Sequence, residues 1–257
     1  MINRERSTGI VVQARMGSSR LPGKMAREFF DGKSLLEIVL ERLISVSESV
    51  PVIVATTMKS ADDFIEQTSK SMGVSVFRGS EEDVMSRFIG AAEENGLETI
   101  IRICADNPFI QPEYVRQLMN YNEDLSCDYV GFRLNKNLPA IKTHLGFFPE
   151  RVELKALKLI HDSGVDSHFR EHVTNYFYSN ENERFTVNWI DLNYPDDVIK
   201  KVRLTIDVEQ DFEISDQIYQ YFRENELQDS DSEIIKYLKG QPSLLKKMEE
   251  NIRENEK

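Results

Sequence analysis

Cysteine, long apolar runs and basic residues are all scarce in this 257-residue chain, and each shortage excludes a class of protein. Two cysteines, Cys104 and Cys127, are too few for a fold built on disulfides, so we expect a reducing, cytoplasmic setting. No apolar run approaches the roughly 18 residues of a membrane-spanning helix. The first residues, Met1–Arg6, lack the apolar core of a signal peptide. We therefore expect no association with a membrane.

Acidic residues outnumber basic ones: the chain has 32 Lys and Arg and 44 Asp and Glu, which gives a formal charge of −12. Binding to a nucleic-acid backbone depends on clustered cations, so we expect no nucleic-acid partner. A small anionic ligand in a local basic pocket is not excluded. Hydrophobic residues make up 40% of the chain, which at this length predicts one α/β domain, alone or with a small appendage.

Short β-branched apolar runs alternate with helical patterns through the first half of the chain. The predicted strands are 9–14, 52–55, 74–77 and 99–104, and the predicted helices are 35–43, 61–72 and 83–92. Such alternation indicates parallel strands with helices on both faces of the sheet. Because ligands of these sheets gather at the carboxyl ends of the strands, we expect the site in the loops after Ala14, Phe77 and Cys104.

The second half has a less regular pattern. The predicted strands are 128–132, 145–148, 185–190 and 202–206, and the predicted helices are 150–161 and 167–177. A charged helical region follows, in which we expect four side chains to face inward: Ile214, Ile218, Tyr221 and Phe222. A break at Gln241–Ser243 divides the chain into a domain over 1–240, with an insertion at about 128–190, and a tail over 241–257. We expect the tail to be a charged helix that is solvated or packed on a partner.

The segment Gln13–Lys24 has the most informative composition. It contains Arg15, Arg20 and Lys24 with two glycines, two serines and no carboxylate, and residues 1–30 carry six basic side chains against two acidic ones. A loop of this kind after a strand can offer backbone N–H groups and cations to phosphate oxygens. A solvated basic turn is the alternative.

Two familiar phosphate-binding motifs fail on spacing. Five residues separate Gly17 from Gly23, and Met25 follows Lys24, whereas a Walker A loop needs four residues and then Ser or Thr after its Lys. The dinucleotide fingerprint G-x-G-x-x-G is absent as well.

The pattern R-x-G-S-S-R-L-P-G-K over residues 15–24 resembles the cytidylyltransferases that activate acidic sugars, among them the CMP-KDO and CMP-sialate synthetases. It is more similar to the bacterial branch named for spore coat polysaccharide biosynthesis protein F. Further matching blocks follow in family order at 77–84, 102–110, 170–174 and 203–211.

The resemblance implies a Rossmann-like, mostly parallel sheet with helices on both faces and a smaller acceptor and dimerisation subdomain. It implies transfer of CMP from CTP to a sugar or sugar-acid acceptor in polysaccharide or glycan biosynthesis, with Mg²⁺ as cofactor, pyrophosphate as product and a homodimer as the assembly. The implied catalytic residues are Arg15, Lys24 and Asp106. The implied nucleotide-binding residues are Gln13, Ala14, Arg15, Gly17, Ser18, Arg20, Lys24, Arg78, Gly79, Ser80 and Asp106.

Two aspartates follow predicted strands and are therefore expected at the ligand edge. Asp106 follows strand 99–104 and Asp207 follows strand 202–206. Two carboxylates over a polyphosphate suit Mg²⁺, which takes its other ligands from phosphate and water. Turn and N-cap roles are the alternative, but the resemblance places the metal-binding aspartates of the family at these blocks. Ala105 stands where the family commonly has glycine, which leaves the shape of this loop open if the backbone needs a positive φ.

Other residues in the matching blocks have two interpretations each. Arg78–Ser80 follows the third predicted strand, where Ser80 could equally cap the next helix. Arg102 could pair with Asp106 or reach an acidic acceptor. Arg102 and His144 are acceptor-side candidates, although a surface role is at least as plausible for His144. The resemblance places Arg170 and His172 in the second half of the family, near the acceptor or the subunit interface.

His168 and His172 also complete H-x-x-E-H, the inverted zinc-protease signature. Three fixed positions match easily by chance, and no further ligand is evident downstream, so this hypothesis is weak.

Two rival functions remain open at this point. One keeps the fold but uses another NTP or a polyol-phosphate acceptor. The other is a non-catalytic nucleotide-binding scaffold, which would be expected to lack the cationic or metal-binding residues. Arg15, Arg20, Lys24, Asp106 and Asp207 are all present.

Overall fold

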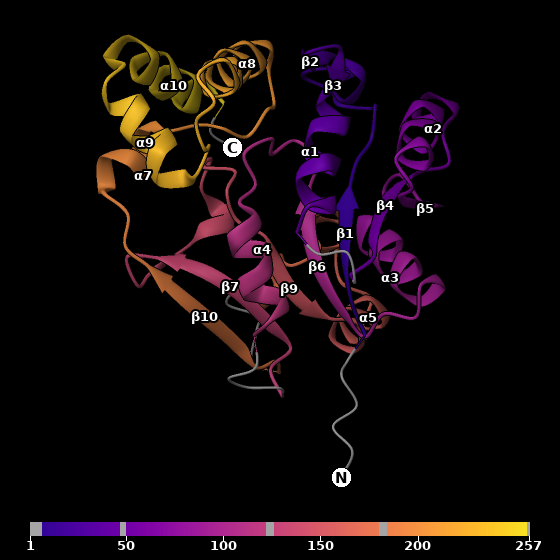
Figure 1. Cartoon of the computed structure of the whole chain (residues 1–257). Helices are drawn as coiled ribbons and strands as arrows, with labels where there is room; N and C mark the ends of the chain where they lie inside the picture. Colours follow the sequence, from indigo (N-terminus) through magenta and orange to yellow (C-terminus); the bar gives the residue numbers. More distant parts are fainter. Residues whose placement is uncertain (1–6, 47–49, 122–125, 180–183, 256–257) are drawn as a thin grey trace.

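A mixed sheet runs through the centre of the computed structural model, which describes residues 7–46, 50–121, 126–179 and 184–255 (Figure 1). The described part of this sheet has eight strands in the order β10-β7-β9-β6-β1-β4-β5, with β8 paired to β7. The strands are β1 (Thr8–Gln13), β4 (Val52–Thr57), β5 (Ser75–Gly79), β6 (Thr99–Cys104), β7 (Tyr129–Leu134), β8 (Leu138–Pro139), β9 (Glu150–Glu153) and β10 (Val187–Leu192). A separate hairpin pairs β2 (Glu28–Phe30) with β3 (Lys33–Ser34).

The four strands predicted in the first half are confirmed, as is their parallel pairing. β1 lies between β4 and β6 and is parallel to both, and β5 adds parallel to β4. Strand β9 interrupts this pattern because it runs antiparallel to both β6 and β7. β10 is again parallel to β7, so the sheet consists of two parallel parts joined through β9.

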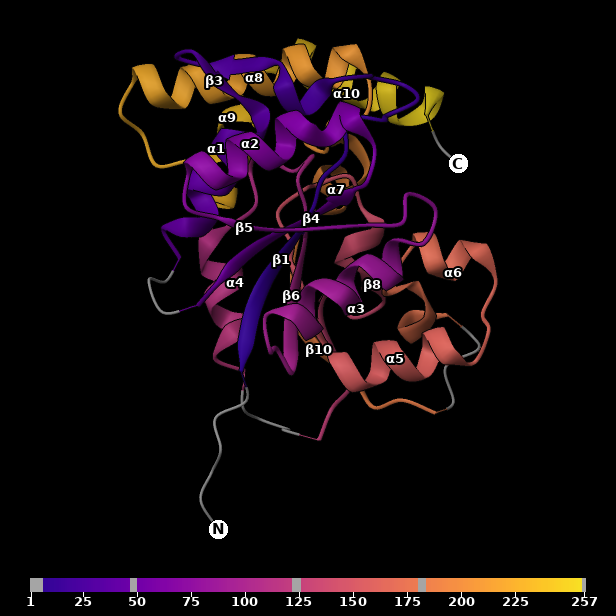
Figure 2. The same ribbon diagram turned by 90° about the vertical axis from the view of Figure 1, so that its right-hand side faces the viewer.

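Helices cover both faces of the sheet, as the alternation of strands and helices predicts (Figure 2). Successive residues of β1 alternate between two apolar cores: Val12 packs in one and Val11 in the other. The core of Val12 includes side chains from α1 (Leu35–Ile44), α2 (Asp63–Ser71), α4 (Pro112–Met119), α7 (Asp196–Lys201), α8 (Glu209–Glu224), α9 (Asp231–Lys239) and α10 (Pro242–Glu254). The core of Val11 includes α3 (Val84–Glu94), α5 (Leu154–Asp162) and the 3₁₀ helix Asn175–Tyr178, and α6 (Ser167–Glu171) contacts α3.

The C-terminal helices lie at the end of the sheet toward which β1 points (Figure 1). Helix α10 packs against α7, α8 and α9. The predicted helix of the tail is confirmed and one of its faces is exposed, but its other face buries Leu244, Met248, Asn251 and Ile252 and packs on the same chain rather than on a partner.

Two predicted strands in the second half are irregular instead. Segments 145–148 and 202–206 lie side by side without a ladder, because Leu204 and Thr205 both donate from their backbone N–H to the carbonyl of His144. Gly146 has a φ of 68°, in the left-handed region, which a regular strand does not tolerate.

Three helix predictions also need correction. The start of helix 150–161 is strand β9, whose buried charges Glu150 and Arg151 resemble a polar helical turn in sequence. Helix 167–177 ends at Glu171 as α6, and a 3₁₀ helix follows at Asn175–Tyr178. Tyr221 is exposed and stacks on Tyr237 rather than facing inward.

Gly90 in α3 provides a test of how tightly this helix packs on β5. Alanine normally stabilises a helix interior by about 1 kcal/mol relative to glycine. A Cβ at position 90 would lie 2.2 Å from Cζ of Phe77, and two more ring atoms are within 2.9 Å. We expect Gly90→Ala to lower the free energy of unfolding by about 1–3 kcal/mol, because the ring must move. Urea denaturation measures this, with Glu94→Ala, at an exposed position of α3, as control; stabilisation by Gly90→Ala would contradict the packing.

Candidate active site

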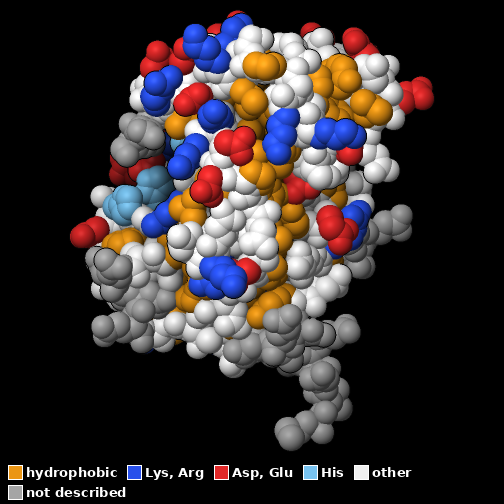
Figure 3. Space-filling model, turned by 90° about the vertical axis from the view of Figure 1, so that its left-hand side faces the viewer, with side chains coloured by type: hydrophobic (Ala, Val, Ile, Leu, Met, Phe, Trp, Pro, Cys, Tyr) orange, Lys and Arg blue, Asp and Glu red, His pale blue; other side chains and the backbone are white. Residues whose placement is uncertain are grey.

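A pocket of about 770 Å³ opens at the carboxyl ends of the central strands. Its lining includes Arg20, Arg102, Asp106, His144, His172 and Asp207, which come from both halves of the chain. Figure 3 shows the left-hand side of the molecule, where acidic and basic side chains are intermingled and histidines gather at one edge. The pocket therefore lies at the edge of the sheet where the ligand site is predicted.

The end of β1 brings the cationic loop to this edge. Gln13 pairs in register with Cys104 of β6 and Ala55 of β4, so the loop leaves from the middle of the sheet. The carbonyl of Met16 accepts from the backbone N–H groups of Ser18, at 2.9 Å, and Gly23, at 3.1 Å. Gly23 has a φ of 73°, a left-handed conformation that favours glycine just before Lys24.

Asp62 anchors this loop, although its sequence position did not suggest such a role. Its carboxylate accepts from the backbone N–H of Met16, at 2.7 Å, and from the N–H and hydroxyl of Thr57 at the end of β4. Asp62 is buried, so these hydrogen bonds compensate for the loss of hydration of its carboxylate. The sequence feature that could have indicated this role of Asp62 is the position of an aspartate shortly after a predicted strand.

Lys24 and Asp106, which are 82 residues apart in sequence, meet directly. The Lys24 Nζ lies 3.1 Å from Asp106 Oδ2 and donates to the carbonyl of Ile206 at 2.5 Å. The backbone N–H of Ile206 in turn donates to the carbonyl of Asp106 at 2.9 Å. Ala105 is not in the left-handed region, so alanine fits this loop where the family commonly has glycine.

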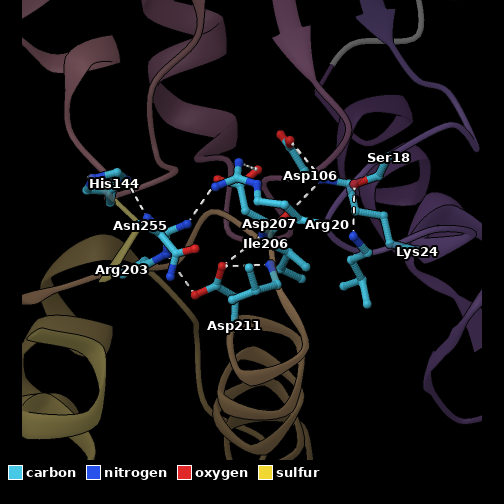
Figure 4. A network of polar contacts seen from close by, with 12 residues as sticks. Ser18, Arg20, Lys24, Asp106, His144, Arg203, Ile206, Asp207, Asp211 and Asn255 are labelled. Carbon is cyan, nitrogen blue, oxygen red and sulfur yellow. Dashed lines mark hydrogen bonds and ion pairs between the residues drawn. The ribbon is translucent and has the colours of Figure 1, made fainter. Parts of the chain in front are cut away.

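Asp207 is held between two guanidinium groups (Figure 4). Its Oδ1 is 2.9 Å from Arg20 and its Oδ2 is 3.0 Å from Arg203. Arg203 is buried, and its other nitrogens donate to Asp211 Oδ1, at 2.8 Å, and to Nδ1 of His144, at 2.8 Å. Because arginine only donates, Nδ1 of His144 accepts in this arrangement. The second-half members of this group, Arg203 and Asp211, had no role assigned from sequence.

Three cations of the site are thus paired with carboxylates of the protein. Asp106 pairs with Lys24. Asp207 pairs with both Arg20 and Arg203, and Asp211 pairs with Arg203. The excess of basic residues over 1–30 therefore does not translate into a purely basic pocket.

Other nucleotide-side candidates occupy different surroundings. Arg15 lies 4.0 Å from Glu171 of α6. Arg78 pairs with Asp63 and Glu66 of α2 and donates to the carbonyls of Thr57 and Lys59, so its charge is used to join β5 to α2. The structure does not bring Arg78 to Arg20 and Lys24.

The turn after β5 is organised around a buried arginine that sequence reasoning missed. Arg87 of α3 donates to the carbonyls of Ser80 and Glu81, and its Cγ would lie 3.1 Å from a Cβ at Gly79. Burial lowers the pKa of Arg87, and the neighbouring charge of Arg15 lowers it further.

The N-cap of α3 is Asp83 and not Ser80. Asp83 accepts from the backbone N–H of Ser86, and Ser80 Oγ accepts from the backbone N–H of Asp83.

On the acceptor side, Arg102 pairs with a residue other than Asp106. It forms a buried ion pair with Glu150 of β9, which also accepts from the hydroxyls of Tyr129, at 2.7 Å, and Thr174, at 2.9 Å. The predicted pairing with Asp106 is therefore wrong. Arg102 still lines the pocket and donates to Cys104 Sγ at 3.4 Å.

The remaining acceptor-side candidates separate into two groups. His144 and His172 line the pocket. Arg170 instead donates to the carbonyl of Val165 at 3.1 Å and lies 3.9 Å from Asp83. α6 ends at Glu171, so His168 and His172 do not share a continuous helix. Within the described ranges no group of three or more His, Cys, Asp and Glu could hold a metal, which contradicts the zinc-protease hypothesis.

The donor set at Asp106 and Asp207 does fit Mg²⁺ bound together with a phosphate ligand. Both residues line the pocket and offer hard carboxylate oxygens. Two protein carboxylates suffice when phosphate and water complete the coordination.

Comparison with known proteins gives this site its family context. The model of a family described as "Cytidylyltransferase" matches residues 9–251. The chain belongs to the cytidylyltransferase family. Spore coat polysaccharide biosynthesis protein SpsF of Bacillus subtilis is 33% identical, over 90% of this chain and 94% of its own.

Two solved structures are similar to this cytidylyltransferase chain. A cytidylyltransferase from Leptospira borgpetersenii superposes with a TM-score of 0.81 at 30% identity, over 93% of this chain and 97% of that one. CMP:2-keto-3-deoxy-manno-octonic acid synthetase complexed with CTP superposes with a TM-score of 0.64 at 17% identity, over 84% and 99%. The second likeness shows the fold, and together these matches confirm the family and fold predicted from the sequence. In the described part of this family member, no helix is both long and apolar enough to cross a membrane.

Cys104 reports on the environment of the cytidylyltransferase pocket. Burial raises the pKa of its thiol to about 11 from an ordinary value of 9.0. A raised pKa keeps the reactive thiolate scarce, so alkylation by iodoacetamide at pH 8 should be about a hundredfold slower than for an ordinary thiol. The rate should keep rising with pH above 9. Mass spectrometry of the native protein measures it, with Cys104→Ser as control; a plateau below pH 9 would contradict this environment.

Proposed function

We propose that this protein transfers CMP from CTP to a sugar or sugar-acid acceptor, with Mg²⁺ as cofactor and pyrophosphate as the second product. The observation that carries the proposal is the convergence of Lys24 and Arg20 with Asp106 and Asp207 beside the pocket. The names of the similar proteins support the nucleotide and the acceptor class: one acts in polysaccharide biosynthesis, and another forms CMP-2-keto-3-deoxy-manno-octonate and was solved with CTP.

The cations of the N-terminal loop would bind the triphosphate by exchanging partners. Arg20 is a third exposed and can turn from Asp207 to a phosphate oxygen. Lys24 is buried, and its bond to the carbonyl of Ile206 keeps its Nζ in place when a phosphate replaces Asp106. Bonds between such cations and phosphate are charge-assisted and strong.

Release of Asp106 and Asp207 from these cations frees carboxylate oxygens for a divalent ion. Mg²⁺, when bound, neutralises charge on the phosphoryl oxygens and the leaving group. The acceptor oxygen forms a bond to the α-phosphorus, the bond from that phosphorus to the pyrophosphate oxygen breaks, and the acceptor hydroxyl proton passes to solvent. Positioning and electrostatics by the chain's own residues supply the catalysis, and no covalent enzyme intermediate is needed.

The rest of the pocket has the composition of a carbohydrate site. Beyond Asp106 it is lined by hydrogen-bonding side chains, including Lys142, Thr174, Asn175 and Tyr178. Lys142 supplies a positive charge on this side that suits an acidic acceptor.

A homodimer remains part of this proposal, and light scattering after size-exclusion chromatography tests it.

Product identification tests the proposed function directly. The protein is incubated with Mg²⁺, a panel of sugar acids and CTP, UTP, GTP or ATP in turn, and the products are identified by mass spectrometry. A CMP-sugar formed only with CTP supports the proposal. Turnover with another NTP or with a polyol phosphate would replace it by the rival nucleotidyltransferase, and tight CTP binding without turnover on any acceptor would favour a nucleotide-binding scaffold.

Asp106→Asn tests the first carboxylate of the proposed metal site. The amide keeps the side-chain shape but loses the charge, so kcat for pyrophosphate release should fall by about a hundredfold or more. Unfolding temperature should change little, because Asp106 is only half-buried. Asp162→Asn, on an exposed position of α5, is the charge-matched control. Full magnesium-dependent activity in Asp106→Asn would refute this assignment.

Arg20→Ala tests the exchange of partners by the loop cations. Loss of one charge-assisted contact to phosphate should raise KM for CTP by about 10- to 100-fold. Arg27→Ala removes the same charge a few residues away, where Arg27 pairs with Glu209, and should leave KM within about threefold. Steady-state kinetics at saturating acceptor distinguishes a specific contact from a general field effect. Equal increases in both variants would indicate the field effect.

A further inference from the structure

The C-terminal helix α10 and the residue that caps it reach the site through two asparagine side chains. Asn251 Nδ2 donates to Asp211 Oδ1 at 2.5 Å, and both residues are almost completely buried. One turn further along, Asn255 Nδ2 donates to Asn251 Oδ1 at 2.8 Å, and Asn255 itself lines the pocket. The last turn of the described chain thus lies against the same pocket as Asp106 and Asp207.

Asp211 is the residue to which this helix is tied, and all of its acceptor capacity is used. Its Oδ1 accepts from Asn251 and from Nε of Arg203. Its Oδ2 accepts from the backbone N–H groups of Asp207, at 2.9 Å, and Val208, at 3.1 Å. Asp211 therefore fixes the backbone at Asp207 and one side of the Arg203 guanidinium together.

Arg203 passes this constraint to the carboxylate of Asp207. Its NH2 lies 3.0 Å from Asp207 Oδ2, and its Nε is fixed by Asp211. A planar guanidinium held at one edge has little freedom to turn, so the group at its other edge is oriented too. The other carboxylate oxygen of Asp207 lies 2.9 Å from Arg20, on the side of the N-terminal loop.

The identity of residue 251 indicates a role beyond packing. The other buried side chains of α10 are Leu244, Met248 and Ile252, all apolar. An asparagine is costly to bury unless its amide is hydrogen-bonded, and an apolar side chain would complete this face more simply. The amide at position 251 meets the otherwise unused acceptor site of Asp211.

We propose that α10 contributes a positioning residue to the site. Asn251 sets the orientation of Asp207 through Asp211 and Arg203. The affinity of the site for a divalent cation then depends on a helix that the sequence pattern separates as a tail beyond residue 240. The inference rests on the proposed function, because it takes Asp207 as a metal ligand.

The test compares two buried positions of the same helix in the full-length chain. Asn251→Leu removes the amide, and Met248→Ala removes apolar volume from the same face. Binding of Mn²⁺, as a spectroscopic substitute for Mg²⁺, is measured by electron paramagnetic resonance with and without CTP. Loss of a residue that supports a metal ligand typically weakens metal affinity 10- to 100-fold. We expect about a tenfold loss in Asn251→Leu and less than a twofold change in Met248→Ala, although both lower the unfolding temperature.

Two further variants keep the outcome decisive. Asn251→Ser, whose hydroxyl is too short to reach Asp211, should reproduce the loss if Asn251→Leu does not fold. Asp207→Asn reports on the proposed metal site alone. Loss of Mn²⁺ affinity in Asp207→Asn with unchanged affinity in the Asn251 variants would overturn the positioning role and leave the metal site standing. An equal loss in Met248→Ala would also overturn it, and unchanged affinity in Asp207→Asn would overturn both assignments.

Discussion

Charge balance in a half-buried cleft is the constraint on which the rest of this structure depends. Carboxylates brought together out of bulk water repel one another and lose hydration, so each needs a cation within reach. Here the cations come from two separate places: the segment Gln13–Lys24, which begins at the end of β1, supplies Arg20 and Lys24, and the irregular segment before α8 supplies Arg203. The fold brings these segments to one edge of the sheet, where their ion pairs add to the packing of Leu21, Met25, Leu204 and Ile206 in one apolar core.

On the proposed function, this pairing would also explain how the site binds a highly charged ligand without being strongly basic. A site with unpaired cations would attract many anions, whereas ion pairs must be exchanged before a phosphate can bind. The ligand must then supply both the negative charge for the cations and, with its metal, the positive charge for the carboxylates. On the proposed function, selectivity for a metal–nucleotide complex would follow from the arrangement of charges as much as from shape.

The sequence predicted the part of this arrangement that follows from strand periodicity. The β-branched runs ending at Ala14 and Cys104 located two parallel strands, and their common carboxyl edge was enough to bring Lys24 close to Asp106. The second half was harder because its segments 145–148 and 202–206 are held by isolated hydrogen bonds that leave no period-two pattern. The ion-pair partner of Arg102 was missed for a related reason: Glu150 lies in a strand whose charged residues were interpreted as a helix start. The metal role of Asp207, the role of Arg15 and the domain division remain predictions.

The antiparallel strand β9 has a consequence for how this protein could diversify. It separates the parallel strands β6, β1, β4 and β5 from the parallel pair β7 and β10, and the two parts share no other strand pairing in the described sheet. Insertions or exchanges in the outer part can therefore lengthen or reshape the walls on the His172 side without shifting the register that places Gln13 beside Cys104. On the proposed function, such modularity would let evolution change which acceptor is accommodated while the nucleotide-facing frame stays the same.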